Sequence, residues 1–409
     1  MRAVSFSNDV RRVISKQQVA KTFAVASALS WFFVLELNFG TFFQYVTNDR
    51  FWVFGAGVLF FVFGTLSTLL GAYISKSVNR RKLLLWSVSI GVLSTLSLAI
   101  FHGNVFSLLL GSLMGFSYGI GFPSAAALFS DSTEIGFRGR CAGILVLITF
   151  ILIAVGMSIA QIASPLELIT IAVVLRALGF LPLTVGTCCG EIGKDKTWSS
   201  ILDRRDVVLY LLPWIMFNVV SGLSNFIYPG LKGPDFVSAI NTGDIAQFFG
   251  VAVFSIVSGF VCDRFGRKPS IVVGILMFGI SFAVLGVAPS PLSVIFQETV
   301  FGVAWGFCMV AYLTIPADLA GSASREKYYA LINVLAFAGF SLTFPVPLIL
   351  GISEPVSLLS PVLSVLLFVS IAPVLFASET LPETELYSRR LREHLDKVGK
   401  EVAESKKKK

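Results

Sequence analysis

Three ionisable side chains lie inside long apolar segments of this chain: Glu36, Arg176 and Glu298. A charge at the centre of a bilayer costs roughly 3 kcal/mol on insertion scales, so each needs a partner, a wet cavity or neutralisation. At about 1.5 Å per residue, Glu36 would lie about 21 Å from the inner edge of its segment. Glu298 would lie about 10 Å below the outer edge of its own segment. Both acids are therefore expected in the outer half of a membrane.

Structural roles are the alternative for these residues. Glu36 could form a buried ion pair with Arg176, and Glu298 could extend outward to the membrane surface. For Arg176, a structural role against neighbouring protein is expected. Recognition of an anionic solute is the alternative if its helix faces a cavity.

A second set of acids and bases is repeated along the chain. Asp131 precedes Arg138 by seven residues, Asp318 precedes Arg325 by seven, and the two copies are 187 residues apart. Asn38-Phe39 recurs as Asn225-Phe226 at the same interval. The chain is therefore two related halves of roughly 190–200 residues. In an apolar chain, parallel repeats indicate a transporter built around a pseudo-two-fold axis along the membrane normal.

The composition predicts the elements that position these residues. The 409 residues are 55% hydrophobic and 14% charged, and about 20 apolar residues span a bilayer. Twelve apolar segments can be traced, and their composition favours helices over the alternating strands of a barrel. The segments are 22–46, 52–75, 83–101, 105–129, 141–162, 166–188, 207–228, 243–262, 270–288, 291–316, 329–351 and 355–377.

The basic residues predict the orientation. With twelve spans, both termini and nearly all of the 32 lysines and arginines fall on one side, and the other side holds only Arg50 and Lys232. This asymmetry places both termini in the cytoplasm. The net charge of +8 is then a topology signal, and no nucleic-acid partner is expected. The outer loops are short, the longest lying around Pro229–Gly243.

The predicted organisation has four parts. Residues 1–190 form a first six-helix bundle, 191–206 a cytoplasmic linker, 207–377 a second six-helix bundle and 378–409 a cytoplasmic tail. In the tail, Leu391, Leu395, Val398 and Val402 have the spacing of an amphipathic helix on the lipid surface.

No cofactor, metal or enzyme chemistry is expected. The five cysteines include no CxxC spacing, and no nucleotide-binding run of the G-x-x-x-x-G-K-[ST] type occurs. The two histidines, His102 and His394, fall in an outer loop and in the tail, with no nucleophile–base arrangement.

The strongest local motif lies between the eighth and ninth segments. It runs Gly259-x-x-x-Asp263-Arg264-x-Gly266-Arg267-Lys268. Gly259 permits close helix packing, and Gly266 permits a tight reversal. Asp263 can accept hydrogen bonds from a helix N-terminus or pair with an arginine. Such contacts can form in one conformation and break in another, so these residues are candidate parts of a gate.

This motif resembles the loop signature of the major facilitator superfamily. The resemblance covers essentially the whole chain and implies two six-helix bundles that rock about a central solute site. The equivalent loop of the first half is degraded, with Ser75 in place of the acid and Val78 in place of the glycine.

A finer similarity exists to the sugar-porter and organic-ion branch. Its inner-loop motifs resemble Pro316-Ala317-Asp318 with Arg325, Asp131 with Arg138-Gly139, and Pro382-Glu383-Thr384. These acid–base pairs are expected gate parts. The paired glutamines of that branch are missing from the seventh segment, which makes a sugar a poor candidate. The glycine–proline motif of drug antiporters is absent from 141–160.

The resemblance also implies that the first, fourth, seventh and tenth spans line the cavity. Glu36 and Glu298 would then share it, and could exchange protons as the cavity changes its exposure. Asn38 and Asn225, as repeat mates, could face each other across the axis. The expected substrate-binding residues are Asn38, Gln44, Tyr118, Asn218, Asn225, Tyr228, Gln297, Trp305 and Tyr312.

These observations predict an all-α membrane protein with twelve transmembrane helices in two pseudo-symmetric bundles. The predicted function is proton-coupled secondary transport of a small organic solute. Proton-driven efflux of organic cations or drugs is one alternative, favoured if Glu36 and Glu298 both line the cavity. A non-transporting sensor or scaffold is another. The expected partners are the solute, protons and the lipid bilayer, with the protein a monomer in the plasma membrane.

Overall fold

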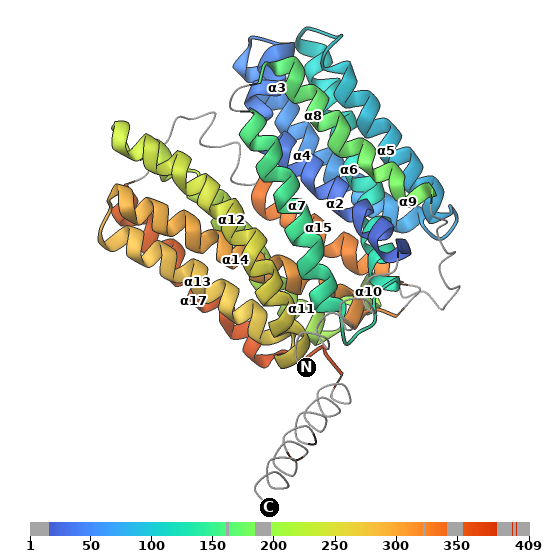
Figure 1. The fold of residues 1–409 in the computed structure, drawn as a ribbon, viewed down its shortest axis with the longest axis vertical. Coiled ribbons are helices and arrows are strands. Elements are labelled where there is room, and N and C mark those ends of the chain that lie inside the picture. The colour runs from blue at the N-terminus through green and yellow to red at the C-terminus, as the bar shows by residue number, and fades with distance from the viewer. Residues whose placement is uncertain are drawn as a thin grey trace, which may run out of the picture.

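The computed structural model describes residues 16–160, 163–184, 198–321, 324–341 and 355–382, together with residues 395 and 398. Every regular element in these residues is a helix (Figure 1). The first half contains α2 (Lys16–Leu37), α3 (Phe39–Val46), α4 (Arg50–Ile74), α5 (Arg80–Ser97), α6 (Asn104–Asp131), α7 (Arg138–Ala160), α8 (Pro165–Ala177), η1 (Leu178–Phe180) and α9 (Leu181–Thr184). The rest contains α10 (Trp198–Leu202), α11 (Arg205–Ser224), η2 (Tyr228–Gly230), α12 (Pro234–Phe265), α13 (Arg267–Val287), α14 (Pro291–Leu319), α15 (Arg325–Ser341) and α17 (Val356–Phe376).

Nine helices of the described residues are long and apolar enough to cross a membrane, or ten if the bent pair α2 and α3 forms one span. Two further expected segments, 83–101 and 329–351, overlap α5 and α15. Residues 342–351 of the latter lie outside the described part of the chain, as do the first polar residues and most of the tail.

The first expected span is not one continuous helix. It bends by 69° between α2 and α3 at Asn38, whose side-chain amide donates to Val34 O over 3.0 Å. Its repeat mate Asn225 lies at the end of α11, before the short 3₁₀ helix η2. An asparagine side chain can satisfy backbone carbonyls that a helix leaves free, which makes it a good residue at a break. The repeated asparagine therefore marks a helix interruption in both halves.

The predicted outer loop around Pro229–Gly243 is wrong over most of its length. α12 begins at Pro234, directly after Gly233, whose φ of 119° suits glycine. Proline is favoured at the first helical position because its missing N–H has no partner there. The short helix α10 lies within the expected linker 191–206.

Glycines allow the closest helix pairs in each half. A Cβ added at Gly111 of α6 would lie 2.5 Å from Ala56 O of α4. Gly115, one turn further along α6, lies still closer to α4. In the second half, Gly302 and Gly306 of α14 pack in the same way against the backbone of α12. The four-residue glycine spacing thus sets the helix separation in both copies.

The two halves meet along α7 and α12, and along α4 and α15. At the α7–α12 seam, Ser255 Oγ donates to Gly143 O over 3.0 Å, and a Cβ at Gly259 would lie 2.7 Å from Gly139 O. Figure 1 shows the ends of α7 and α12 opposite to this seam diverging. The seam therefore joins the halves toward one end only.

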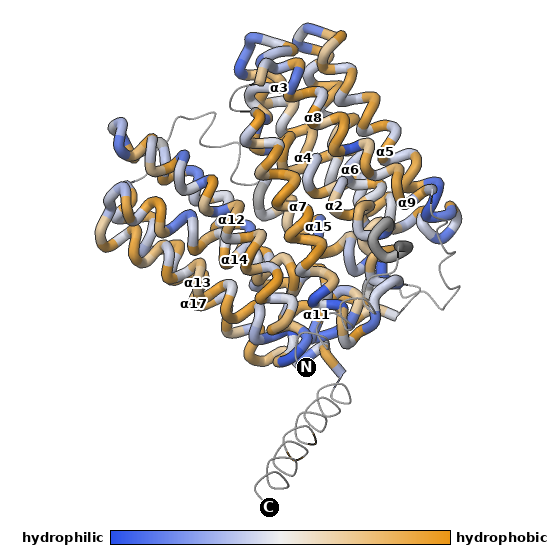
Figure 2. Tube along the Cα trace, viewed as in Figure 1, coloured by the Kyte–Doolittle hydropathy of each residue, from blue (hydrophilic) through white to orange (hydrophobic). Residues whose placement is uncertain are grey.

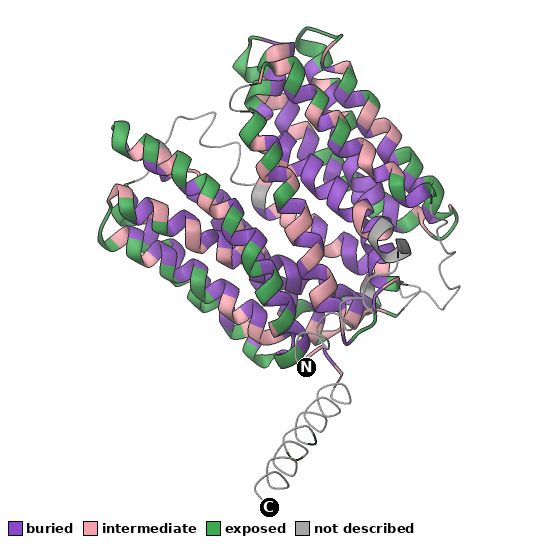
Figure 3. Ribbon diagram, viewed as in Figure 1, coloured by how far each residue is buried: buried purple, intermediate pink, exposed green. Residues whose placement is uncertain are grey.

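The outer surface of the helices is apolar, while polar residues gather at the helix ends (Figure 2). Many large apolar side chains on this outer surface are exposed (Figure 3). They include Leu66, Leu93, Val155, Phe249 and Val369. A lipid environment accounts for this exposure, since water would penalise it.

Replacing Gly115 by alanine tests the role of close helix approach. The added methyl would lie 3.0 Å from Gly64 N and closer still to Phe60 O, and overpacking of this kind costs about 1–3 kcal/mol. We expect the melting temperature of the purified protein to fall by several degrees. Gly40→Ala is the matched control, because Gly40 is exposed and its nearest neighbour would lie 4.0 Å away. Equal melting temperatures for the two variants would contradict this account.

Candidate functional site

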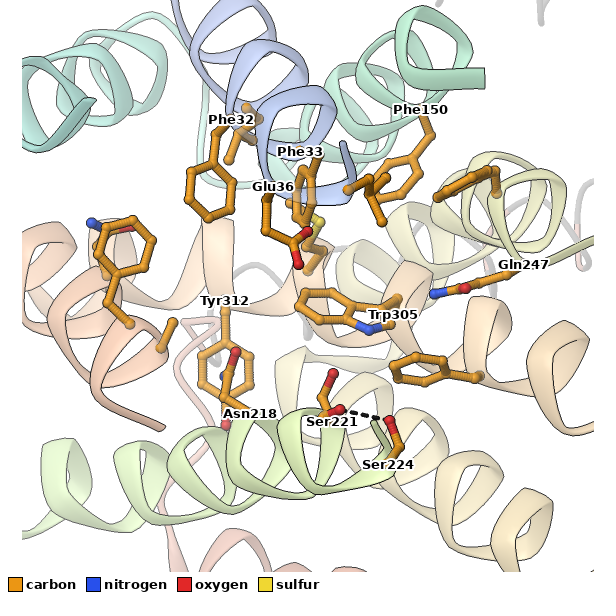
Figure 4. Close-up of a pocket in the computed structure, with 18 of the residues that line it drawn as sticks. Phe32, Phe33, Glu36, Phe150, Asn218, Ser221, Ser224, Gln247, Trp305 and Tyr312 are labelled. Atoms are coloured by element: carbon orange, nitrogen blue, oxygen red, sulfur yellow. Dashed lines mark hydrogen bonds between the residues drawn. The ribbon is translucent and has the colours of Figure 1, made fainter. Parts of the chain in front are cut away.

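A cavity of about 260 Å³ lies where α2, α4, α6, α7, α11, α12, α14 and α15 approach one another. Thirteen of its 28 lining residues are aromatic. Figure 4 shows Phe32, Phe33 and Phe150 on one side, with Trp305 between them and the polar residues of α11. Such walls offer flat apolar surfaces and π-faces to a bound molecule.

The charged residues that line the cavity are all acidic. They are Glu36, Asp244 and Glu298, and no lysine or arginine of the described residues lines it. Glu36 accepts no hydrogen bond from the described part of the chain, and its carboxylate points into the cavity in Figure 4. The cavity is therefore electrostatically suited to a cation.

Glu298 has a different environment from that of Glu36. It is only 3% exposed and is hydrogen-bonded to the hydroxyl of Tyr228. The same hydroxyl lies 2.9 Å from Gln297 Oε1. Glu298 is thus held by a hydrogen bond between α14 and η2, whereas Glu36 faces the cavity without such a bond from the described residues.

Six of the nine expected substrate-binding residues line this cavity. They are Tyr118, Asn218, Asn225, Tyr228, Trp305 and Tyr312. Asn38, Gln44 and Gln297 do not line it. The Asn38 amide lies 3.0 Å from Met157 Sδ of α7, so it does not face Asn225 across the cavity, and Gln44 is exposed.

Several polar groups at the cavity already have protein partners. Asn218 donates to Trp214 O over 2.8 Å, and Tyr312 donates to Tyr210 O over 2.7 Å. Trp305 makes no hydrogen bond with the described residues, and it contacts other rings edge-on. Trp305 and Glu36 are therefore among the polar cavity groups that remain able to bond a ligand.

The lining residues that were not expected from the sequence include Asp244, Gln247 and Asn333. Asp244 lies at the start of the expected span 243–262, whereas α12 begins ten residues earlier, so Asp244 lies within the helix. Asn333 lies on α15, a span that the family resemblance did not place at the cavity. Its amide donates to Thr68 Oγ1 of α4 over 3.0 Å, so it ties the two halves together.

Arg176 does not pair with Glu36. Its guanidinium donates to Ser87 Oγ and to Ser117 O, and it lies 4.7 Å from the ring of Trp31. It is buried within the first half and does not line the cavity. This environment fits the structural role and gives no support to anion recognition.

The repeated acids and bases form two equivalent clusters at one end of the molecule, which we term the charged end. Asp131 binds Arg80 and Arg325, and Asp318 binds Arg138 and Arg267. Arg80 and Arg267 are also 187 residues apart. In each cluster one arginine comes from the other half, so the pairs do not form within each seven-residue copy. Asp318 is the more buried, with 1% of its side chain exposed against 26% for Asp131.

Asp263 bonds to the start of α7. Its carboxylate accepts from Gly139 N over 2.8 Å and from Arg140 N over 3.0 Å, and it pairs with Arg267. A carboxylate at a helix N-terminus is favoured by the free N–H groups and by the helix dipole. Asp263 thereby links α12 of the second half to α7 of the first.

The equivalent position of the first half carries the opposite charge. At the interval of 187 residues that relates Arg80 to Arg267, the counterpart of Asp263 is Lys76 rather than Ser75. Burial and the adjacent Lys327 lower the pKa of Lys76. Glu326, next to Lys327, binds Arg80 and supplies the acid that the loop lacks.

The remaining motif residues shape the turn between α12 and α13. Gly266 has a φ of 109° and lies against Glu379, which accepts from Arg267 N and Lys268 N. Lys268 Nζ donates to Ala377 O over 2.7 Å, and Arg264 lies over the ring of Phe265. Of the tail motif, only Pro382 is among the described residues.

The sequence was compared with known proteins. The profile of the family described as the Major Facilitator Superfamily matches residues 193–405. "Multidrug resistance protein 2" of Bacillus subtilis (strain 168) is 26% identical over 144 residues, which are 34% of this chain and 36% of that protein. "Inner membrane transport protein YajR" of Escherichia coli (strain K12) is 32% identical over 100 residues, 24% of this chain and 21% of that protein. The matched part of this chain spans about a third of the length of the former relative and a fifth of the latter.

The two aspartates of the charged end allow a matched test. Asp318→Asn leaves the buried Arg138 without its carboxylate and Arg267 with Asp263 alone, and breaking a buried pair costs about 3–5 kcal/mol. Asp131→Asn breaks a more exposed cluster and should cost less. We therefore expect Asp318→Asn to lower the melting temperature more than Asp131→Asn does. An equal or reversed order would show that burial does not govern these clusters.

Proposed function

This chain belongs to the major facilitator superfamily, and we propose that it is a secondary active transporter that moves small organic cations in exchange for protons. The supporting observation is the composition of the cavity wall, which combines three carboxylates with many aromatic rings and no basic residue of the described part. Carboxylates compensate a cationic charge, and aromatic faces attract cations by about 0.5–2 kcal/mol each. The same wall would disfavour an anionic solute.

Charge balance supports coupling to protons. Charged carboxylates that lack a compensating positive charge are costly in a low-dielectric surrounding. Either a bound cation or a bound proton can supply that compensation. Release of a cationic solute on one side therefore favours uptake of protons there. Uptake of the cation and release of the protons on the other side return the protein to its starting state. Glu36 and Glu298 are the carboxylates proposed to take part in this exchange.

The relatives support the class of solute only broadly. Two matched Bacillus subtilis proteins bear the name multidrug resistance, "Multidrug resistance protein 2" and "Multidrug resistance protein 1". A cavity walled by aromatic rings is the kind of site that accepts solutes of different shape, because its main contacts are non-directional.

We further infer the arrangement in the membrane. The twelve spans form two six-helix bundles, 1–190 and 207–377, joined by the cytoplasmic linker 191–206 and followed by the cytoplasmic tail 378–409. The charged end faces the cytoplasm of a monomer in the plasma membrane, because the basic loops lie there. The ion pairs of the charged end then close the cytoplasmic side, and opening requires the two halves to separate at that end.

Transport of tetraphenylphosphonium into proteoliposomes tests the proposal. We expect accumulation driven by an imposed pH gradient, and a loss of at least tenfold in Glu36→Gln, since about 1.4 kcal/mol of lost charge compensation changes an equilibrium tenfold. Glu134→Gln, an exposed acid outside the cavity, is the control. Unchanged transport in Glu36→Gln would remove that residue from the mechanism. Absence of counterflow with every cation tried would favour a sensor on a transporter fold.

Trp305 gives a second test of the same site. Trp305→Leu removes a π-face from the cavity wall, whereas Trp305→Phe retains a smaller one. The cation–π term of about 0.5–1 kcal/mol predicts a two- to sixfold weaker affinity for tetraphenylphosphonium in the leucine variant. The phenylalanine variant should lie between it and the original protein. Equilibrium binding to the purified protein measures this order, and equal affinities would argue against aromatic recognition.

A further inference from the structure

Tyr228 lies between two consecutive side chains of α14. Its hydroxyl is 2.9 Å from Gln297 Oε1 and is also hydrogen-bonded to Glu298 Oε1. Gln297 is fully buried, and Glu298 nearly so. Three oxygen atoms therefore share hydrogen bonds in a place with little access to water.

The number of hydrogens decides which bonds can coexist. A tyrosine hydroxyl carries one hydrogen and can donate it to one acceptor at a time, while neither a charged carboxylate nor an amide oxygen donates. Both contacts of the Tyr228 hydroxyl can be hydrogen bonds if Glu298 is protonated. The carboxyl group then donates to the hydroxyl, and the hydroxyl donates to Gln297 Oε1. With charged Glu298, the amide of Gln297 must turn so that its nitrogen donates to Tyr228, which then donates to the carboxylate.

The second arrangement exchanges one hydrogen bond of Gln297 for another, because Oε1 turns away from Tyr228 as Nε2 turns toward it. Gln297 Nε2 has no hydrogen-bond partner within the described residues. Turning the amide therefore gives this nitrogen a bond that it otherwise lacks. The group Gln297–Tyr228–Glu298 can reverse the direction of its hydrogen bonds, so Glu298 keeps a partner with and without its proton.

The other groups near Glu298 do not compensate its charge. Gly243 of α12 packs against its methylene groups, and the nearby acid is Asp244 on the same helix. From η2 the titratable neighbour is Tyr228. Among the described residues, no lysine or arginine lines this part of the cavity. Glu36 has no comparable donor, so the two acids are suited to different tasks.

We propose that Tyr228 and Gln297 are positioning residues that make Glu298 the proton-carrying carboxylate, while Glu36 compensates the charge of the bound cation. The role in transport rests on the proposed function, whereas the control of Glu298 titration does not. In the exchange step, Glu298 takes a proton from water on one side and releases it to water on the other. No other covalent bond forms or breaks.

The hydrogen bonds of Gln297, Tyr228 and Glu298 also link the proton on Glu298 to the packing of η2 against α14. Tyr228 belongs to η2, beyond the point where α11 ends, and its bond ties this segment to α14. A hydrogen bond to a charged carboxylate is roughly twice as strong as one between neutral groups. Protonation of Glu298 therefore weakens the attachment of η2 to α14.

Infrared difference titration of the purified protein tests the assignment. The carboxyl band lost in Glu298→Gln identifies this residue, and its titration midpoint is then followed in Tyr228→Phe. Loss of the hydroxyl donor should move the midpoint upward by about one pH unit, a tenfold change in the proton dissociation constant. Gln297→Met removes the acceptor that competes for the Tyr228 hydrogen, so the hydroxyl is left to the charged carboxylate and the midpoint should move downward. This variant serves as the second measurement if Tyr228→Phe does not fold. The exposed Tyr73→Phe is the matched control and should leave the midpoint unchanged.

Proteoliposomes separate this inference from the proposed function. Tyr228→Phe should shift the pH dependence of gradient-driven tetraphenylphosphonium accumulation, whereas Tyr73→Phe, outside the cavity, should leave both counterflow and its pH dependence unchanged. A midpoint identical to that of Tyr73→Phe in both variants would overturn the inference, as would loss of the titrating band in Glu36→Gln instead of Glu298→Gln. A shifted band in a protein that moves no cation would support the role of Tyr228 and Gln297 and overturn the proposed function.

Discussion

The two halves of the molecule are joined by carboxylates that each bind arginines from both halves. Asp318 is almost fully buried between Arg138 and Arg267, and such a charge is stable only while both partners remain. The bonds of Asp263 to the start of α7 act across the same boundary. Because glycines bring α7 and α12 together beside these bonds, the halves are held firmly at the charged end. Access to the cavity in this conformation is accordingly expected from the end where α7 and α12 diverge (Figure 1).

The repeat separates the residues that hold the halves together from those that give the cavity its chemistry. The charged end is nearly the same in both copies, except that Glu326 supplies an acid where the loop has Lys76. The cavity acids have no repeat mates, since Leu223 corresponds to Glu36 and Gly111 to Glu298. Symmetry is useful for a contact that must close two halves against each other. A binding site for an asymmetric solute has no such requirement.

The sequence predicted the helical class, the two related halves and the membership of the repeated acids and bases in ion-pair clusters. It did not predict that Asp131 pairs with Arg325 rather than with Arg138, because spacing along the chain does not determine which helices become neighbours. It also missed Asn333, whose orientation depends on which face of α15 meets α4. The sequence did not predict that α12 begins at Pro234, because the first residues of this helix are polar and resemble a loop in composition.

The helix break at Asn38 places Glu36 at the C-terminal end of α2, and this position determines its electrostatic environment. Glu36 is the penultimate residue of α2, where the free carbonyls and the helix dipole place partial negative charge. A carboxylate there is repelled by its own helix and has no hydrogen-bond donor among the described residues. The Glu298 carboxylate, by contrast, lies within α14 and is bonded to Tyr228. An external positive charge consequently stabilises Glu36 more than Glu298, which is the physical basis for expecting the solute at the first acid and the proton at the second.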